Sequence, residues 1–219
     1  MSACELRVCV RVRARVTDVS VKAWLRILMS TPALARAMAG FVELITHVPC
    51  PEFVSARVRG TALVLMSVLS QPPPDEASIL SYVTWYVSVY EHFAARGVRF
   101  SIIYDLSRIH GAPDLAIVNM KWRLTQQLIP RTSVQVVGFV ILTAPEAAGL
   151  VTIVRAIFAA RQGELTQRAL TSDPAEVVSI VAQFGGTGAI MTDAERAQLR
   201  ALPIDTAAIE MIVTESCAL

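Results

Sequence analysis

Hydrophobic and polar residues alternate strictly along the first part of the chain. From Leu6 to Val16 every second residue is apolar, and the positions between are arginines and one cysteine. This period of two predicts a β-strand with one buried face and one basic face. No aromatic residues are interleaved to stack on nucleic-acid bases, so we interpret the basic face as a solvated strand surface that discourages aggregation.

The apolar residues that follow have helical spacing. They predict helices over residues 19–29 and 33–46, with a proline in the first turn of the second. The segment His47–Pro51 then breaks the pattern. Its single histidine and single cysteine are too few for a zinc site, and we interpret the segment as a turn. Residues 1–52 are therefore predicted to form an N-terminal strand-and-helix extension.

Strands and helices alternate through the middle of the chain. Short apolar runs bounded by glycine or proline predict strands, and longer runs with helical spacing predict helices. The order is strand, strand, long helix, and then strand and helix three times. The predicted ranges are 53–59, 62–69, 76–96, 99–105, 112–128, 133–142, 144–160, 165–170 and 172–184.

This alternation predicts an α/β core over residues 53–184, with a mixed or parallel sheet packed with helices. The strands at 62–69, 99–105 and 134–142 are nearly continuous in apolar residues, which places them at the centre of the sheet. Residues 185–219 form a C-terminal extension with a short capped helix. Within it, the run Ile204–Val213 fits either a strand or a helix.

The long predicted helix carries an apolar stripe rich in aromatic residues. Such a stripe is more typical of a core or a dimer contact than of a cofactor site, and we interpret it so. The stripe consists of Ile79, Tyr82, Val83, Trp85, Tyr86, Val87, Val89, Tyr90 and Phe93.

Composition narrows the class of protein. Of the 219 residues, 54% are hydrophobic and 17% charged, and the mean hydropathy is +0.52. The longest apolar stretch, 136–160, is interrupted by Pro145, Glu146 and Arg155, so we predict no transmembrane segment. The N-terminus does not resemble a signal peptide. Four scattered cysteines without a C-x-x-C pair indicate neither zinc nor disulfides, and a net charge of +2 gives no indication of nucleic-acid binding. We expect a cytoplasmic protein without cofactor or metal.

Polar residues gather where the strand 99–105 ends. Asp105 closes the strand, and Ser107, His110 and Asp114 follow within the next loop. The carboxyl ends of strands are where function gathers in open α/β sheets, so we predict a partner-binding surface at these four residues. We expect Asp105 to accept hydrogen bonds from backbone N–H groups of its own turn. We assign no catalytic residue.

The sequence Tyr104-Asp105-Leu106-Ser107-Arg108-Ile109, in this order of elements, resembles the STAS family of anti-sigma-factor antagonists and sulfate-transporter cytoplasmic domains. The runs 137–142 and 165–178 are similar to the closing section of that family. The resemblance implies a regulatory module that binds a protein partner. The regulatory serine of the family would fall near His110–Asp114, where this chain has no serine, although Ser107 is close by.

Three functions follow as hypotheses. The first is a non-catalytic STAS-like regulatory or protein-interaction module that binds a protein partner or itself. The second is a carrier of a lipid or other small apolar ligand, since high hydrophobicity without a membrane span fits a pocket between helices and sheet. The third is an enzyme in which Asp105 and His110, with Asp114 nearby, perform acid–base chemistry.

Overall fold

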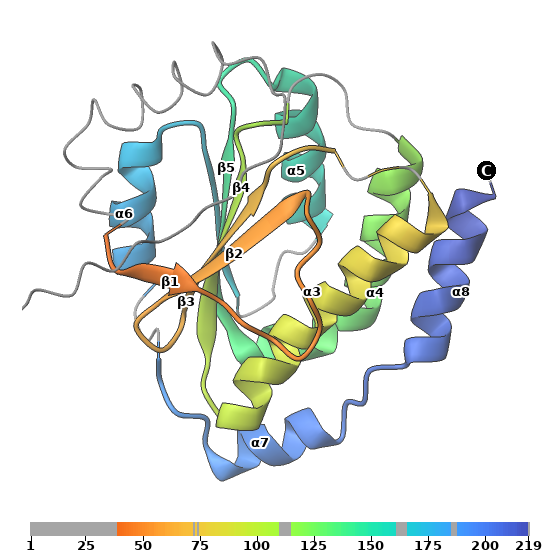
Figure 1. The fold of residues 1–219 in the computed structure, drawn as a ribbon. Helices are drawn as coiled ribbons and strands as arrows, with labels where there is room; N and C mark the ends of the chain where they lie inside the picture. Colours follow the sequence, from red (N-terminus) through yellow and green to blue (C-terminus); the bar gives the residue numbers. More distant parts are fainter. Residues whose placement is uncertain are drawn as a thin grey trace, which may run out of the picture. The chain divides into compact units, whose positions relative to one another are not determined.

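The computed structural model describes residues 39–71, 73, 75–109, 115–160, 166–184 and 188–218. Contacts within the chain divide it into two units, Met1–Met38 and Ala39–Leu219, and the described residues all belong to the second. The predicted strand at 6–16 and the predicted helix at 19–29 lie outside the described residues. Element labels follow Figure 1.

A six-stranded mixed sheet runs through the second unit (Figure 1). Its strands are β1 (Phe41–Glu43), β2 (Val54–Arg59), β3 (Leu63–Val68), β4 (Phe100–Leu106), β5 (Val136–Thr143) and β6 (Gln167–Thr171), and they lie in the sheet in this order. The first three are antiparallel, and β3 to β6 are parallel. The predicted α/β fold is thereby confirmed, and so is the interior position of β3, β4 and β5.

Helices cover both faces of this sheet. They are α3 (Glu76–Arg96), α4 (Leu115–Gln135), α5 (Ala148–Ala160), α6 (Pro174–Gln183), α7 (Asp193–Arg200) and α8 (Thr206–Cys217). Right-handed crossovers between neighbouring parallel strands place α3, α4 and α5 on one face, and α6 lies on the other (Figure 1). Helix α8 packs on α3 and α4. No helix in the described part of the chain combines the length and apolarity needed to cross a membrane.

Helix α3 has the bounds that its local signals predict. Asp75 caps its start, and its side chain accepts a hydrogen bond of 2.8 Å from the backbone N–H of Ser78. Gly97 ends it in the left-handed conformation, with φ of 62°, and donates its N–H to the carbonyl of Ala94. Both signals depend on neighbouring residues only, so the sequence suffices to place them.

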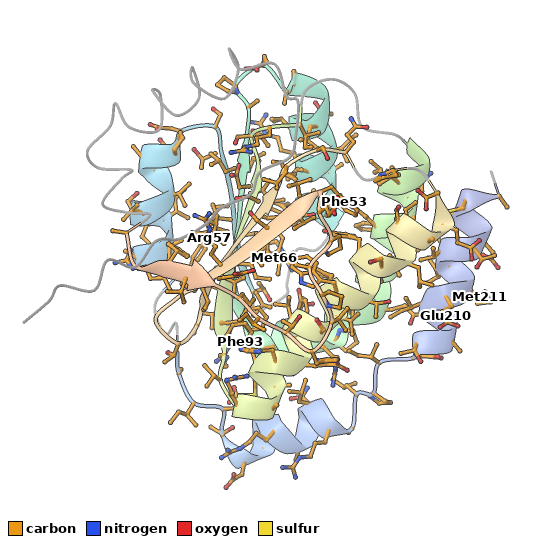
Figure 2. The ribbon with its side chains drawn as sticks, viewed as in Figure 1. Phe53, Arg57, Met66, Phe93, Glu210 and Met211 are labelled. Carbon is orange, nitrogen blue, oxygen red and sulfur yellow. The ribbon has the colours of Figure 1, made fainter. Side chains whose placement is uncertain are left out.

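The main core lies between the sheet and α3, α4, α5 and α8. Alternate residues of β4 (Phe100, Ile102 and Tyr104) point into it, as does Met66 of β3. Phe93 of α3 stacks on Phe100 with ring centroids 4.2 Å apart. Met66 and Phe93 are labelled in Figure 2, and both are almost fully buried.

The second face of the sheet is covered at β5 by the end of α6. A Cβ atom on Gly138 would come within 2.0 Å of the Phe184 ring, so this residue must be glycine for the ring to pack on the strand. Ser101, Ile103 and Val140 are buried on the same face.

The predicted helix 33–46 is wrong where the structure describes it. Phe41–Glu43 forms the edge strand β1, which pairs antiparallel with Arg57–Arg59 of β2. The apolar residues in this segment have a helical spacing, but cross-strand hydrogen bonds to β2 decide its conformation. Residues 41–43 thus belong to the same sheet as the predicted core.

Three other boundaries differ from the sequence prediction. Helix α4 continues through Pro130 to Gln135, so Ser133–Gln135 is helix and the strand begins at Val136. Thr132, Val134 and Gln135 are buried, and this packing holds the last turn in place despite the N–H that proline lacks. Helix α5 begins at Ala148, after a turn. The run 204–213, which fitted either a strand or a helix, is helical from Thr206 onward, where α8 begins.

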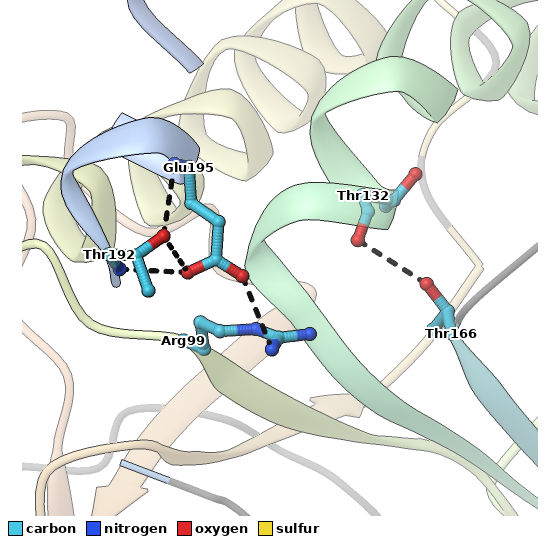
Figure 3. Close-up of polar contacts among 5 residues, drawn as sticks. All are labelled: Arg99, Thr132, Thr166, Thr192 and Glu195. Carbon is cyan, nitrogen blue, oxygen red and sulfur yellow. Dashed lines mark hydrogen bonds and ion pairs between the residues drawn. The ribbon is translucent and has the colours of Figure 1, made fainter. Parts of the chain in front are cut away.

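The C-terminal extension is tied to the start of β4. Backbone hydrogen bonds link Arg99 to Ala189 and Met191 to Gly97. Helix α7 then opens with a capping box between Thr192 and Glu195, and Glu195 also pairs with Arg99 at 3.5 Å (Figure 3). The backbone N–H of Thr192, which donates to the Glu195 carboxylate at 2.8 Å, holds the pKa of that carboxyl below its usual value.

Candidate functional site

The Asp105 carboxylate fastens the carboxyl end of β4. Its Oδ1 accepts hydrogen bonds from the backbone N–H of Ser107 at 3.0 Å and from the Ser107 hydroxyl at 2.6 Å. Its Oδ2 accepts one from the hydroxyl of Ser67, the residue directly opposite on β3, at 3.1 Å. The expected hydrogen bond from the turn is confirmed. The carboxylate connects β3, β4 and the following turn, so its role in the described structure is to stabilise this end of the sheet.

The four predicted partner-binding residues are only partly visible. Asp105 is half-buried and Ser107 is buried, with its hydroxyl turned to Asp105. His110 and Asp114 lie outside the described residues. The acid–base hypothesis requires His110 beside Asp105, and the described part of the site provides only the carboxylate with its three donors.

A second site lies on the opposite face of the sheet, under the helices. It is an apolar pocket of about 240 Å³ between α3, α4, α5 and strands β3 to β6. Helices α4 and α5 stand apart (Figure 1), and side chains of both line the pocket. Its apolar walls include Leu106, Leu124, Leu128, Phe139, Ile141, Leu150, Val154 and Phe158.

The aromatic stripe of α3 forms one wall of this pocket. Tyr82, Tyr86 and Tyr90 follow one another at intervals of four residues and lie on one side of the helix. Their rings contact in sequence, with centroids 6.1 Å and 5.2 Å apart. The interpretation of the stripe as core is confirmed, since Tyr82, Trp85, Tyr90 and Phe93 are all buried. The sequence interpretation missed that the three tyrosines also line a pocket. Their hydroxyl groups, repeated at intervals of four residues, are the signal that could have indicated it.

A small polar group interrupts the apolar wall. The hydroxyls of Tyr82 on α3 and Tyr104 on β4 form a short hydrogen bond. Burial, reinforced by the neighbouring Tyr104, holds the pKa of Tyr82 well above its ordinary value, so this phenol keeps its proton. The Lys121 ammonium of α4 lies 5.0 Å from the centroid of the Tyr82 ring and 5.9 Å from that of Tyr104.

The far end of the pocket is closed by a hydrogen bond between α4 and the start of β6. The Thr166 hydroxyl donates to the backbone carbonyl of Thr132 at 3.3 Å (Figure 3). Both residues are buried and line the pocket, together with Val136 and Arg168. The pocket therefore extends from the carboxyl end of β4 to the amino end of β5.

The other candidate site residues, His47 and Cys50, do not form a common site. The His47 ring pairs with Glu91 at 3.3 Å, and the Cys50 thiol donates to the carbonyl of Val54 at 3.4 Å, so the two residues serve separate local contacts. Within the described ranges, no three His, Cys, Asp or Glu side chains gather as metal ligands would.

No family model matches this chain, and no curated protein or solved structure matches it either.

Proposed function

We propose that this protein is a non-catalytic binding domain that holds a small apolar molecule in the pocket between α3, α4, α5 and the sheet. The observation that carries the proposal is the pocket itself, about 240 Å³ in volume and walled almost entirely by aliphatic and aromatic side chains. Ligand sites are typically apolar hollows with a few polar groups that fix orientation, and Tyr82, Tyr104 and Lys121 supply such groups here.

The volume sets the size of the ligand. An apolar cavity of roughly 150 Å³ accommodates benzene in an engineered protein. In proportion, a pocket of about 240 Å³ holds a molecule of roughly ten non-hydrogen atoms. A medium-length hydrocarbon chain or a fused pair of aromatic rings has this size.

Hydrophobic burial alone gives such a ligand a modest affinity. Burial of an eight-carbon chain contributes about 6 kcal/mol, at roughly 0.8 kcal/mol for each carbon. Association itself costs about 4–15 kcal/mol in lost freedom. A bare hydrocarbon is therefore held weakly, and a polar contact decides whether a ligand binds well.

A pair of matched variants tests the proposal with 1-octanol as the probe. Val154 of α5 lines the pocket, whereas Val178 of α6 is exposed on the other side of the sheet. Calorimetry should show octanol binding to the wild type and to Val178→Phe, but not to Val154→Phe, whose ring fills the pocket. At a probe concentration 100 times Kd, binding stabilises by about 2.7 kcal/mol, which raises Tm by about 5–11 °C.

Two results would count against the proposal. One is a wild-type protein that binds neither octanol nor any probe of similar size. The other is an equal affinity of the two phenylalanine variants for octanol, which would place binding outside the pocket.

The second candidate function is the STAS-like regulatory or protein-interaction module. It is supported by the succession of strands and helices from β2 to α6 and by the Asp105–Ser107 turn at the carboxyl edge. In that case Asp105, Ser107, His110 and Asp114 border the surface for a protein partner or a second copy. Native mass spectrometry separates the two candidates, because it shows either a co-purifying small ligand or an oligomer.

We expect a cytoplasmic location under either proposed function. It rests on the scattered cysteines, of which Cys50 and Cys217 are free thiols in the structure.

A further inference from the structure

The polar residues in the pocket wall, Tyr82, Tyr104 and Lys121, have hydrogen-bond donors without a matching acceptor. Lys121 is half-buried, and no carboxylate of the described residues lies within ion-pair distance of its ammonium. Its contacts there are the faces of the Tyr82 and Tyr104 rings. Ring faces attract a cation but leave its three N–H donors unbonded.

The tyrosine pair has a donor to spare as well. Each phenol carries one hydrogen, and in the bond between Tyr82 and Tyr104 one hydroxyl donates while the other accepts. The hydrogen of the accepting hydroxyl remains, and among the described residues neither hydroxyl has a second partner. Both residues are more than nine-tenths buried, so solvent is a poor substitute.

These donors converge from three elements on one end of the pocket, whose far end is lined by Thr132, Thr166 and Arg168. Tyr82 belongs to α3, Tyr104 to β4 and Lys121 to α4. From there the lining continues along α4 through the apolar side chains of Leu124 and Leu128, before it reaches Thr132. A molecule with one anionic end and a hydrocarbon body matches both parts.

We propose that the ligand of this pocket is a small monocarboxylic acid. Its carboxylate accepts hydrogen bonds from Lys121 and the Tyr82–Tyr104 pair, and its apolar body lies along Leu124 and Leu128. This inference rests on the proposed function, since it specifies the head group of the molecule in the pocket. At this end of the pocket one ammonium group offsets one negative charge, which favours a monoanion over a dianion such as a phosphate monoester.

The test compares octanoate with 1-octanol, two probes of nearly equal length that differ in the head group. Isothermal calorimetry at neutral pH measures Kd for both on the wild type, Lys121→Met and Arg123→Met. The last is the matched control, because Arg123 lies on the same helix but is exposed and pairs with Glu215 at 2.7 Å. Methionine keeps an unbranched apolar stem and removes the charge in both variants.

We expect the wild type and Arg123→Met to bind octanoate more tightly than octanol by about tenfold or more, the gain of one charge-assisted hydrogen bond. Lys121→Met should lose this preference and bind octanol as before. The double variant Tyr82→Phe/Tyr104→Phe keeps both rings and should show a reduced preference.

The outcomes separate this inference from the proposed function. If octanol binds but octanoate has no advantage, or keeps it in Lys121→Met, the carboxylate assignment is overturned while the pocket remains a binding site. If neither probe binds the wild type, both are overturned. An unchanged preference in the double tyrosine variant removes the phenols from the head-group site.

Discussion

Replacing Asp105 with alanine should destabilise this protein without changing the pocket. Three hydrogen bonds end on the Asp105 carboxylate, from the Ser107 N–H, the Ser107 hydroxyl and the Ser67 hydroxyl, at distances of 2.6–3.1 Å. Alanine leaves all three donors without their acceptor. Asp105 alternates along β4 with Tyr104 and Leu106, which line the pocket, so its side chain lies on the opposite face of the sheet and octanol binding should be unaffected.

The expected magnitude follows from the burial of these groups. A hydrogen bond to a charged group contributes about 1.5–3 kcal/mol when it is buried. Asp105 is half-buried and water reaches part of the carboxylate, so we expect a total loss of about 2–3 kcal/mol. For a chain of this length that lowers Tm by about 4–12 °C. Asp105→Asn keeps one acceptor oxygen and should lose about half as much.

Thermal and urea unfolding of the two Asp105 variants measure this loss, with Asp193→Ala as the control. The Asp193 side chain is 98% exposed and pairs with Arg196 on its own helix, so its removal should change stability by less than about 0.5 kcal/mol. If Asp105→Ala unfolds like the wild type, the structural role of the carboxylate is refuted. If the variant folds normally but loses a protein partner, the partner-binding hypothesis is supported instead. If it folds normally but loses an activity, the enzyme hypothesis is supported.

Two further predictions concern packing and pH. Gly138→Ala should lower the free energy of unfolding by about 1–3 kcal/mol, because its methyl group meets the Phe184 ring, whereas Gly149→Ala in α5 meets nothing and should stabilise by up to about 1 kcal/mol. Equal Tm changes in these two variants would contradict the packing argument. The hydrogen bond from Thr192 lowers the pKa of Glu195, so this carboxylate stabilises the fold at neutral pH and loses that effect as the pH falls below about 4.5. The Tm difference between wild type and Glu195→Gln should therefore shrink between pH 7 and pH 3, and a constant difference would show that the charge of the Glu195 carboxylate contributes nothing to stability.

Where local signals are strong, the sequence is sufficient to predict the structure. Asp75 and Gly97 set the bounds of α3, and Gly60 marks the turn between β2 and β3 with φ of 59°. Continuous apolar runs correctly placed β3, β4 and β5 inside the sheet. Each of these signals operates within a few residues along the chain, or reflects burial on both faces of one strand.

Pairing between distant segments lies beyond such signals. The spacing of apolar residues near Phe41 is helical, yet Phe41–Glu43 forms an edge strand because it pairs with β2. Pro130 predicts the end of a helix, but α4 continues to Gln135 because Thr132 and Gln135 are buried in contacts with the rest of the fold. In both segments tertiary contacts outweigh local propensity.

The candidate site shows the same division. The sequence by itself determined the Asp105–Ser107 turn, because an aspartate at a strand end bonds its own backbone. It also determined the aromatic stripe that includes Tyr82. Only the tertiary structure decided that Tyr82, Tyr104 and Lys121, from three separate elements, meet at one end of an apolar pocket. The physical reason is that right-handed crossovers place α3 and α4 on the same face of the sheet as the Tyr104 side chain, a consequence of strand order that residue patterns do not carry.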